Sequence, residues 1–333
     1  MTNTIRIGMF GAGRMAHIHA EQLRVIAPEV QIVAACSLSG VRAEEMAAKW
    51  GGRAYTDYRR MLDETEMDAA YICTPTTVHA EMGLACVERG LHLFMEKPLD
   101  LDLTAARRLV DAAEEANVLA LVAFHWRYTE GYERAAELID GAPVALVNLR
   151  WYWTRPPLQW MWRRAEAGGQ IVDQNIHLLD LSRGLAGDVE TVYAAYNQRQ
   201  VNFEADFDDW DGYALTLRYK RGAVGACAGS YALFPEIQLG PAADFALRDQ
   251  LVRVTDQGAF LYEPDGVQEW PNRDPFHRGV NRAFIQALRT GDPSFIHTPL
   301  ASGFRSTAVA LAANHAAGIG QPVNVDDFIA ANS

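Results

Sequence analysis

Three side chains of this sequence could share the proton transfers of one reaction: Lys97, Asp173 and His177. A lysine in a buried or cation-rich place can give and take a proton near neutral pH, which suits exchange with an alcohol. Asp173, His177 and Asp180 are spaced i, i+4 and i+7, so they share one face of the helix expected over Ile171–Leu185. An Asp–His pair on a helix surface is ordinary by itself. Together with Lys97 it indicates acid/base chemistry.

A glycine-rich turn opens the chain with the run Gly11-Ala12-Gly13-Arg14-Met15-Ala16. It follows a predicted strand and begins a predicted helix. The first glycine permits a tight turn, the second lets the backbone approach a pyrophosphate, and the small Ala16 allows close packing of helix on strand. The helix N-terminus adds free N–H groups for the phosphates. We therefore expect a dinucleotide there, held by Gly11, Gly13, Arg14 and Met15.

The end of the second predicted strand bears on the choice between NAD and NADP. An acid commonly binds the adenosine ribose of NAD at this place, but this sequence has no acid before Glu44. Ser37 and Ser39 could donate hydrogen bonds to a 2′-phosphate, and Arg42 could pair with it. The alternative is that Arg42 is an exposed residue at a helix start. This pattern favours NADP over NAD, with NAD left open.

Strands and helices must place these residues, and their order changes along the chain. Residues 1–125 alternate apolar strands with helices, which predicts an α/β Rossmann domain with a doubly wound parallel sheet. From residue 126 the strands lengthen and alternate in polarity. Residues 126–333 are therefore predicted to form an α+β domain for substrate binding and oligomerisation, with a large, mostly antiparallel open sheet.

Charge and composition exclude several classes of partner. A net charge of −12 argues against nucleic acid and anionic membranes, and no run is apolar enough to span a bilayer. The start of the chain lacks a signal peptide and the four cysteines form no Cys-x-x-Cys pair, so a cytoplasmic protein without a metal site is expected. A solvated loop is preferred to a cation site for the acidic run Glu204, Asp206, Asp208, Asp209 and Asp211.

Four motifs together resemble the glucose–fructose oxidoreductase/inositol dehydrogenase/MocA (Gfo/Idh/MocA) family. They are the glycine turn, Thr74-Pro75 with His79, Glu96-Lys97-Pro98, and Gly-Gly followed by Asp-x-x-x-His-x-x-Asp. Their order and spacing match over nearly the whole chain. The resemblance implies a nicotinamide cofactor, NAD(P)(H), between a Rossmann domain and a larger domain whose open sheet often forms subunit contacts. It also implies a sugar or cyclitol substrate and a homodimer or homotetramer.

The resemblance also assigns roles to individual residues. Lys97 would share the hydroxyl proton and touch the nicotinamide ribose, His177 would be the second acid/base group, and Asp173 would orient substrate or histidine. Glu96 and Pro98 would shape the turn that presents Lys97. The cofactor path would be lined by Thr74, Pro75 and His79.

Two positions depart from the family pattern. Arg127 matches an arginine expected to contact the cofactor, but the asparagine common two residues earlier is His125 here, which puts that contact in doubt. Gln170 stands where a third glycine is frequent. Other histidines, including His19 and His277, are expected to be packing or surface residues.

Aromatic residues crowd the segment before the Asp/His stretch. Trp151 and Trp153 share a strand face and suit a core or a subunit interface slightly better than a sugar wall. Trp160 and Trp162 suit either role equally.

The expected function is an NAD(P)-dependent dehydrogenase that transfers a hydride between the nicotinamide and a hydroxyl- or carbonyl-bearing carbon of a sugar, sugar derivative or cyclitol. Two other functions compete with it. One is a glycosidase that holds and recycles its nicotinamide, oxidising a sugar transiently to eliminate a substituent. The other is a non-catalytic nicotinamide-binding regulator, against which the complete Lys97, Asp173 and His177 set argues.

Overall fold

The computed structural model describes residues 4–234, 236–237 and 239–333, which form two compact units. The first unit contains the chain up to His125 together with His277–Phe304, and the second contains Trp126–Phe276 and Arg305–Ser333. The segment 277–304, which lies within the predicted second domain (residues 126–333), packs with the first unit. Its helix α10 (Arg278–Thr290) lies against α1 and buries the apolar residues Val280, Phe284, Ile285 and Ala287.

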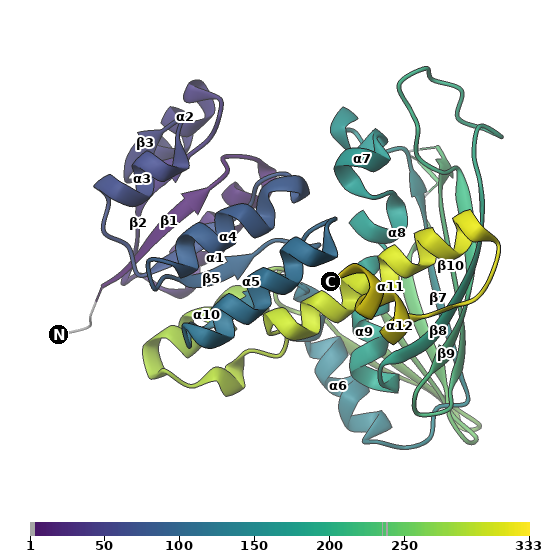
Figure 1. Ribbon diagram of the computed structural model, residues 1–333. Coiled ribbons are helices and arrows are strands. Elements are labelled where there is room, and N and C mark those ends of the chain that lie inside the picture. Colours follow the sequence, from purple (N-terminus) through teal and green to yellow (C-terminus); the bar gives the residue numbers. More distant parts are fainter. Residues whose placement is uncertain (1–3, 235, 238) are drawn as a thin grey trace. The chain divides into compact units, whose positions relative to one another are not determined.

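The first unit is built on a six-stranded parallel sheet in the order β3-β2-β1-β4-β5-β6 (Figure 1). Its strands are β1 (Ile5–Phe10), β2 (Val30–Cys36), β3 (Arg53–Tyr55), β4 (Ala69–Ile72), β5 (His92–Met95) and β6 (Ala120–Val122). Its other helices are α1 (Arg14–Ile26), α2 (Gly40–Trp50), α3 (Tyr58–Glu64), α4 (His79–Val87), α5 (Leu103–Glu115) and the start of α11 (Leu300–Ile319). The predicted doubly wound Rossmann sheet is confirmed.

The strand order reverses between the neighbours β1 and β4. The two halves of the sheet wind in opposite directions from this point, so the connections that follow β1 and β4 run to opposite faces of the sheet. Doubly wound sheets bind ligands outside the carboxyl ends of their strands at such a switch point. The fold alone therefore directs attention to the residues that follow β1, β4 and β5.

The second unit is built on a nine-stranded sheet in the order β14-β13-β12-β11-β7-β10-β9-β8-β15. Its strands are β7 (Leu146–Thr154), β8 (Val189–Asn197), β9 (Gly212–Tyr219), β10 (Val224–Leu233), β11 (Leu239–Ala246), β12 (Leu251–Thr255), β13 (Gly258–Glu263), β14 (Gly266–Pro271) and β15 (Val323–Asn324). β7 and β10 pair in parallel and the remaining pairs are antiparallel. The predicted large, mostly antiparallel sheet is confirmed.

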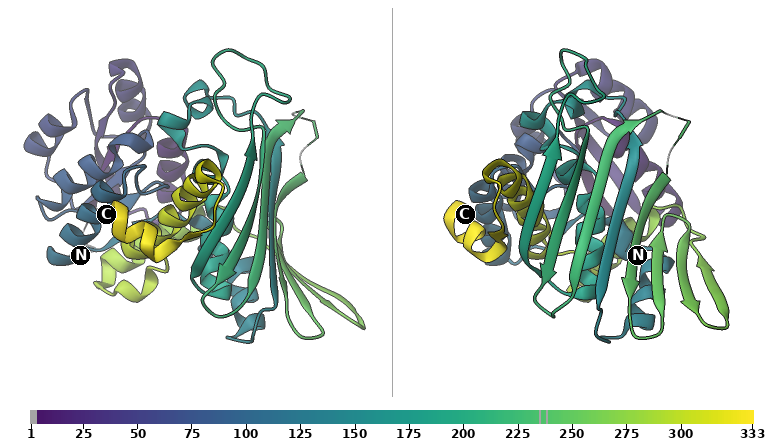
Figure 2. Two further views of the ribbon diagram at one scale, coloured as in Figure 1. Left: turned by 45° about the vertical axis from the view of Figure 1, so that its right-hand side comes forward. Right: turned by 90° about the vertical axis from the view of Figure 1, so that its right-hand side faces the viewer.

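The helices of the second unit lie on one face of this sheet (Figure 2). They are α6 (Glu130–Ile139), α7 (Arg164–Ala167), α8 (Gln170–Asp173), α9 (Ile176–Ala186), the rest of α11 and α12 (Val325–Asn332). The strands alternate accordingly: Tyr213, Leu215 and Leu217 of β9 are buried, while Ala214 and Thr216 between them are exposed. The described part of the chain contains no helix that is both long and apolar enough to cross a membrane.

Candidate active site

The glycine-rich turn after β1 has the backbone that a pyrophosphate site requires. Gly11 adopts φ +99°, and a Cβ atom on it would lie 2.4 Å from the carbonyl oxygen of Cys73. A Cβ on Gly13 would meet nothing within 4 Å, so the turn is open on that side. Gly13 is the N-cap residue of α1, whose first N–H groups can bind an anion. Ala16 is fully buried, as its packing role demands.

The loop after β4 lies beside this turn and carries Thr74, Pro75 and His79. The backbone nitrogen of Thr74 would be 3.2 Å from a Cβ on Gly11, so the two loops are adjacent. The Thr74 hydroxyl oxygen is buried and has no hydrogen-bond partner among the described residues. A cofactor hydroxyl or phosphate would satisfy it. The residues of the first unit therefore fit a bound dinucleotide.

His79 joins this loop to the turn that carries Lys97. Its Nε2 lies 2.9 Å from the Thr74 carbonyl oxygen and its Nδ1 lies 2.8 Å from the Pro98 carbonyl oxygen. The ring is 1% exposed. Both ring nitrogens are therefore engaged with backbone, which gives His79 a bracing role between the two loops.

Lys97 follows β5 at the same carboxyl edge and is half-buried. Its backbone N–H donates to Oε2 of Glu96 at 3.2 Å, and the Lys97–Pro98 peptide is cis. Burial raises the pKa of Glu96, but interactions with His19, chiefly a hydrogen bond, and with Lys97 and His277 outweigh it and lower the pKa to about 2. Lys97 is therefore accompanied by a buried carboxylate.

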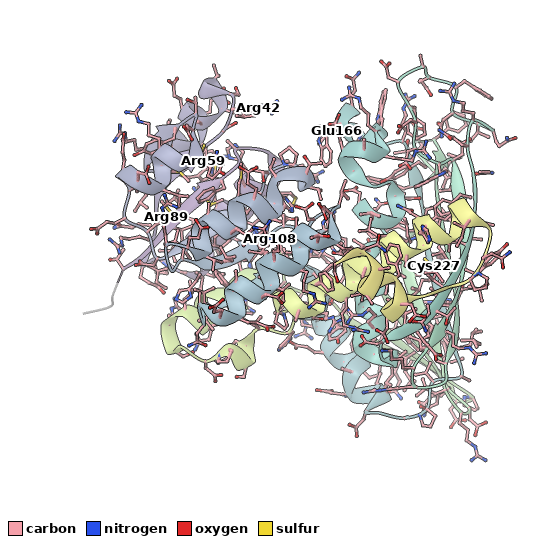
Figure 3. The ribbon with its side chains drawn as sticks, in the orientation of Figure 1. Arg42, Arg59, Arg89, Arg108, Glu166 and Cys227 are labelled. Carbon is pink, nitrogen blue, oxygen red and sulfur yellow. The ribbon has the colours of Figure 1, made fainter. Side chains whose placement is uncertain are left out.

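Two of the polar side chains after β2 already form hydrogen bonds within the protein. Ser39 caps α2, its hydroxyl accepting from the Arg42 N–H at 3.4 Å. The Ser37 hydroxyl accepts from the Ser39 N–H at 3.3 Å. The Arg42 side chain is exposed near the start of α2 (Figure 3). Arg42 can thus reach a phosphate from solvent.

The prediction that one continuous helix carries both Asp173 and His177 is wrong. α8 ends at Asp173 and α9 begins at Ile176. Asn175 causes the break, because its side-chain amide donates to the Tyr213 hydroxyl on β9 at 2.7 Å and to the Ala228 carbonyl on β10 at 3.4 Å. Those bonds hold the backbone away from a straight helical path. Asp173 and His177 are both buried, 8% and 5% exposed.

Gln170, the departure from a third glycine, anchors the other end of α8. Its amide nitrogen donates to Gln174 Oε1 at 2.8 Å and to the carbonyl oxygens of Ser230 and Trp151 at 3.2 and 3.3 Å. Two buried amides therefore tie the Asp173/His177 stretch to β7, β9 and β10.

Arg127 and Asp180 form a buried ion pair in the second unit. Arg127 Nε lies 2.7 Å from Asp180 Oδ2, and Nη2 lies 3.0 Å from Oδ1 and 2.8 Å from the backbone oxygen. Ser306 adds a hydrogen bond to Asp180 Oδ1 at 2.7 Å. Asp180 is thereby assigned to the core, and the arginine expected to contact cofactor is bound to it.

The acidic loop before β9 is less solvated than expected. Asp209 is fully buried, and burial, with the charges of Asp173 and Asp208, raises its pKa to about 8. Asp211 is also buried, because its carboxylate caps the N–H groups of Gln200, Val201 and Asn202. No group of three or more potential ligands in residues 4–234, 236–237 and 239–333 could hold a metal ion.

Tyr231 of β10 lies near Asp173, and no feature of the sequence indicated this. Burial and the neighbouring carboxyl groups of Asp173 and Asp209 raise the pKa of this tyrosine, which is 1% exposed. Tyr231 and Asp173 are far apart in the sequence, so no local pattern could indicate that they are neighbours.

Two of the tryptophans singled out in the sequence have clear partners. Trp151 lies near His177, with ring centres 6.4 Å apart, and Trp162 donates to the Pro156 carbonyl at 2.7 Å.

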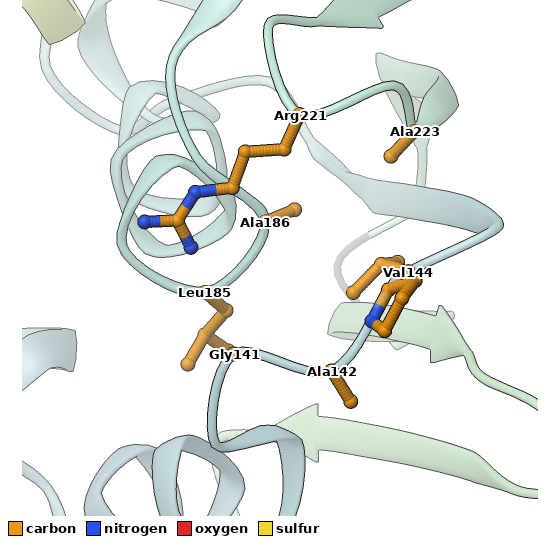
Figure 4. A pocket seen from close by; sticks show the side chains of 8 residues that line it. Gly141, Ala142, Val144, Leu185, Ala186, Arg221 and Ala223 are labelled. Atoms are coloured by element: carbon orange, nitrogen blue, oxygen red, sulfur yellow. The ribbon is translucent and has the colours of Figure 1, made fainter.

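A pocket of about 320 Å³ in the second unit lies elsewhere (Figure 4). Its lining includes Leu185 and Ala186 at the end of α9, whereas His177 is in the first turn of that helix. Apart from Arg221 the lining is apolar or small. It offers no acid/base pair and is not the candidate site.

Two segments of the chain match known protein families. Residues 5–124 match an oxidoreductase family with an NAD-binding Rossmann fold, and residues 132–239 match the GFO/IDH/MocA C-terminal domain. The chain is 32% identical to the D-xylose 1-dehydrogenase (NADP(+)) 2 of Haloferax volcanii, covering 86% of this chain and 89% of that one. It is 29% identical to the myo-inositol 2-dehydrogenase of Thermotoga maritima, over 68% of each chain.

Solved structures share the fold. The WlbA dehydrogenase from Bordetella pertussis, in complex with NADH and UDP-GlcNAcA, superposes with a TM-score of 0.83 at 24% identity. The superposition covers 96% of this chain and 98% of that one.

Proposed function

Because this chain belongs to the Gfo/Idh/MocA family of NAD(P)-dependent oxidoreductases, we propose that it transfers a hydride between the nicotinamide and a hydroxyl- or carbonyl-bearing carbon of a sugar, sugar derivative or cyclitol. One observation carries the proposal: Lys97 and the open glycine turn stand at the carboxyl edge of one parallel sheet. The names of the relatives, an inositol dehydrogenase and a xylose dehydrogenase, support the substrate class.

The cofactor would be held by the backbone at Gly11 and Gly13, by the first turn of α1 at Arg14 and Met15, and by Thr74 and Pro75. Nicotinamide, when bound, accepts or donates the hydride. The protein's own part is proton transfer and orientation. As the carbon loses hydride, its hydroxyl proton passes to the side chain of Lys97, and the C–O bond becomes a carbonyl. In the reverse direction Lys97 returns that proton.

His177 is proposed as the second acid/base group and Asp173 as the residue that orients substrate or histidine. Both side chains are buried on short helices anchored to the sheet, which suits groups that must hold a fixed direction. Glu96 and Pro98 shape the turn of Lys97, and His79 braces it.

We favour NADP over NAD. Arg42 is exposed at the start of α2 and can pair with a 2′-phosphate, while Ser37 lies at the end of β2. Replacing Arg42 with alanine should then weaken NADP more than NAD. An equal effect on both would contradict the assignment of Arg42 to the 2′-phosphate.

We also propose a homodimer or homotetramer formed through the uncovered face of the nine-stranded sheet. Leu146 and Val224, exposed by 46% and 47%, are register partners on β7 and β10, and Tyr193 of β8 is exposed on the same sheet. Apolar residues grouped on a sheet face suit a subunit contact. A cytoplasmic location belongs to the same proposal, since the four cysteines are free thiols.

The test is a screen of sugars, sugar acids and cyclitols with NAD and NADP, in which the absorbance of the reduced nicotinamide is monitored for wild type and Lys97→Ala. A signal that Lys97→Ala reduces by ~10² or more would support the proposal. Cleavage of an aryl glycoside by protein that retains its nicotinamide, without net reduction, would replace it with the recycling glycosidase.

A further inference from the structure

A buried polar cluster lies behind the Lys97 turn, entirely within the first unit. It joins His19 of α1, Glu96 at the end of β5 and Asn281 of α10. His19 and Asn281 are 0% exposed and Glu96 is 6% exposed. His19 was expected to be a packing or surface residue. The structure instead gives it two hydrogen bonds to polar side chains far away in the sequence.

The protonation of the His19 ring follows from its partners. Asn281 Nδ2 donates to the His277 carbonyl oxygen at 2.7 Å and lies 2.8 Å from His19 Nδ1. An amide nitrogen offers N–H groups only, so Nδ1 must accept. The ring proton is then on Nε2, which lies 2.8 Å from Glu96 Oε1. Asn281 therefore selects the tautomer that donates to Glu96.

Aromatic rings surround this pair and keep water away from it. The His19 ring centre lies 4.7 Å from that of Phe94 and 6.0 Å from that of Tyr71, and Tyr71 stacks on Phe94 at 4.2 Å. A hydrogen bond to a carboxylate is strong in such surroundings, and its loss leaves a buried charge unsatisfied.

The other carboxylate oxygen of Glu96 accepts the backbone N–H of Lys97. The four groups thus form a chain from Asn281 through His19 and Glu96 to the peptide of Lys97. His19 is also in the first half of α1, the helix whose N-terminus forms the glycine turn. One side chain connects the nucleotide turn with the lysine turn.

We propose that His19 is a positioning residue for Lys97: by donating to Glu96 it holds the lysine turn in register with the helix that binds the cofactor. This inference rests on the proposed acid/base role of Lys97. It predicts that loss of the Nε2 donor lowers kcat more than it weakens cofactor binding.

Two amide substitutions separate this role from a general need for a polar residue. In His19→Gln the amide nitrogen can occupy the place of Nε2 and still donate to Glu96. In His19→Asn the side chain reaches only the place of Nδ1, so Glu96 loses its donor. His17→Gln and His17→Asn are matched controls, because His17 lies on the same helix and accepts from Trp50 instead.

The measurements are kcat, KM, the pH profile of kcat/KM, and the affinity for NADPH and NADH by fluorescence, for these variants and Lys97→Ala. We expect His19→Asn to lower kcat by about 10- to 100-fold, the cost of a misplaced catalytic group. The affinity for the reduced cofactor should stay within about 3-fold of wild type. The acid limb of the pH profile of kcat/KM should move to higher pH, because Glu96 without its hydrogen-bond donor protonates more readily.

His19→Gln should recover kcat to within about 5-fold of wild type, and the His17 pair should behave like wild type. Equal losses in His19→Gln and His19→Asn, or a His19→Asn enzyme with unchanged kcat and pH profile, would overturn the inference. If Lys97→Ala itself keeps full turnover, the proposed function fails instead. Melting curves of the two His19 variants identify a loss that is due to unfolding.

Discussion

The side chains of Arg127 and Asp180 form a buried, two-pronged ion pair, with contacts of 2.7 and 3.0 Å. Arg127 comes directly after the first unit's last sheet strand and its loop, and Asp180 is on α9. The pair consequently ties the start of the second unit to the helix that carries His177. Ser306 of α11 joins it through Asp180.

Breaking this pair from one side should be costly, because the other charge remains buried. We expect Arg127→Met to lower the free energy of unfolding by about 3–5 kcal/mol. Chemical denaturation, monitored by tryptophan fluorescence, measures the change. The double variant Arg127→Met/Asp180→Leu should recover most of the loss, and a single variant as stable as wild type would contradict the assigned pairing.

The carboxylate of Glu96 should make the free energy of unfolding depend on pH at acidic pH. Its pKa falls from an ordinary 4.5 to about 2 on folding, so the folded state binds fewer protons than the unfolded state between those values. This contribution is complete above pH 4.5 and is lost as the pH falls toward 2, at roughly 3 kcal/mol in total.

Denaturation midpoints of wild type and Glu96→Gln between the two pKa values test this point. The advantage of wild type should shrink steadily as the pH falls. Glu21→Gln is the matched control, since Glu21 is an exposed acid on α1. A constant difference across the range would show that Glu96 has an ordinary pKa in the folded protein.

Asp209 should have the opposite effect. Burial and nearby acids raise its pKa from 3.8 to about 8, so the folded state binds more protons than the unfolded state in between. Stability is therefore lost as the pH rises from about 4 to 8 and is level above that range. Asp209→Asn removes the titration.

The Asp209→Asn protein should gain on wild type as the pH rises through this window, and thermal unfolding at several pH values would show it. Asp206→Asn, an exposed acid of the same loop, is the control. A gain that is independent of pH, or equal in both variants, would contradict a raised pKa for Asp209.

Asn175 should matter for turnover because it sets the break between α8 and α9. In Asn175→Ala both hydrogen bonds to β9 and β10 are lost, and the relative direction of Asp173 and His177 can change. We expect kcat to fall by at least about 10-fold, with nicotinamide affinity unchanged. Steady-state kinetics beside Asn332→Ala, an exposed asparagine on α12, would check it; normal turnover would show that the break has no role in placing the two residues.

Structural features that depend on neighbouring residues were predicted well from the sequence. The turn at Gly11 and Gly13 depends on backbone conformation and on the strand and helix that flank it, all within a few residues. The alternation of the first unit and the change to longer alternating strands were also visible.

Contacts between distant segments were not predictable in this way. The straight helix over Ile171–Leu185 failed because Asn175 finds its partners on strands that lie 38 and 53 residues later. Likewise His19 and Glu96 are 77 residues apart, and Asn281 is 262 residues from His19. Helical spacing says nothing about such partners, so a single sequence leaves the supporting residues of the site unassigned.

The central claim is that Lys97 takes the hydroxyl proton as hydride leaves the substrate. The most direct measurement is the pre-steady-state rate of nicotinamide reduction for wild type and Lys97→Met. It is made with unlabelled substrate and with substrate deuterated at the carbon that loses hydride. We expect the variant to slow this step by ~10² or more, with a primary isotope effect and nicotinamide affinity close to wild type. An unchanged hydride-transfer rate in Lys97→Met would contradict the account.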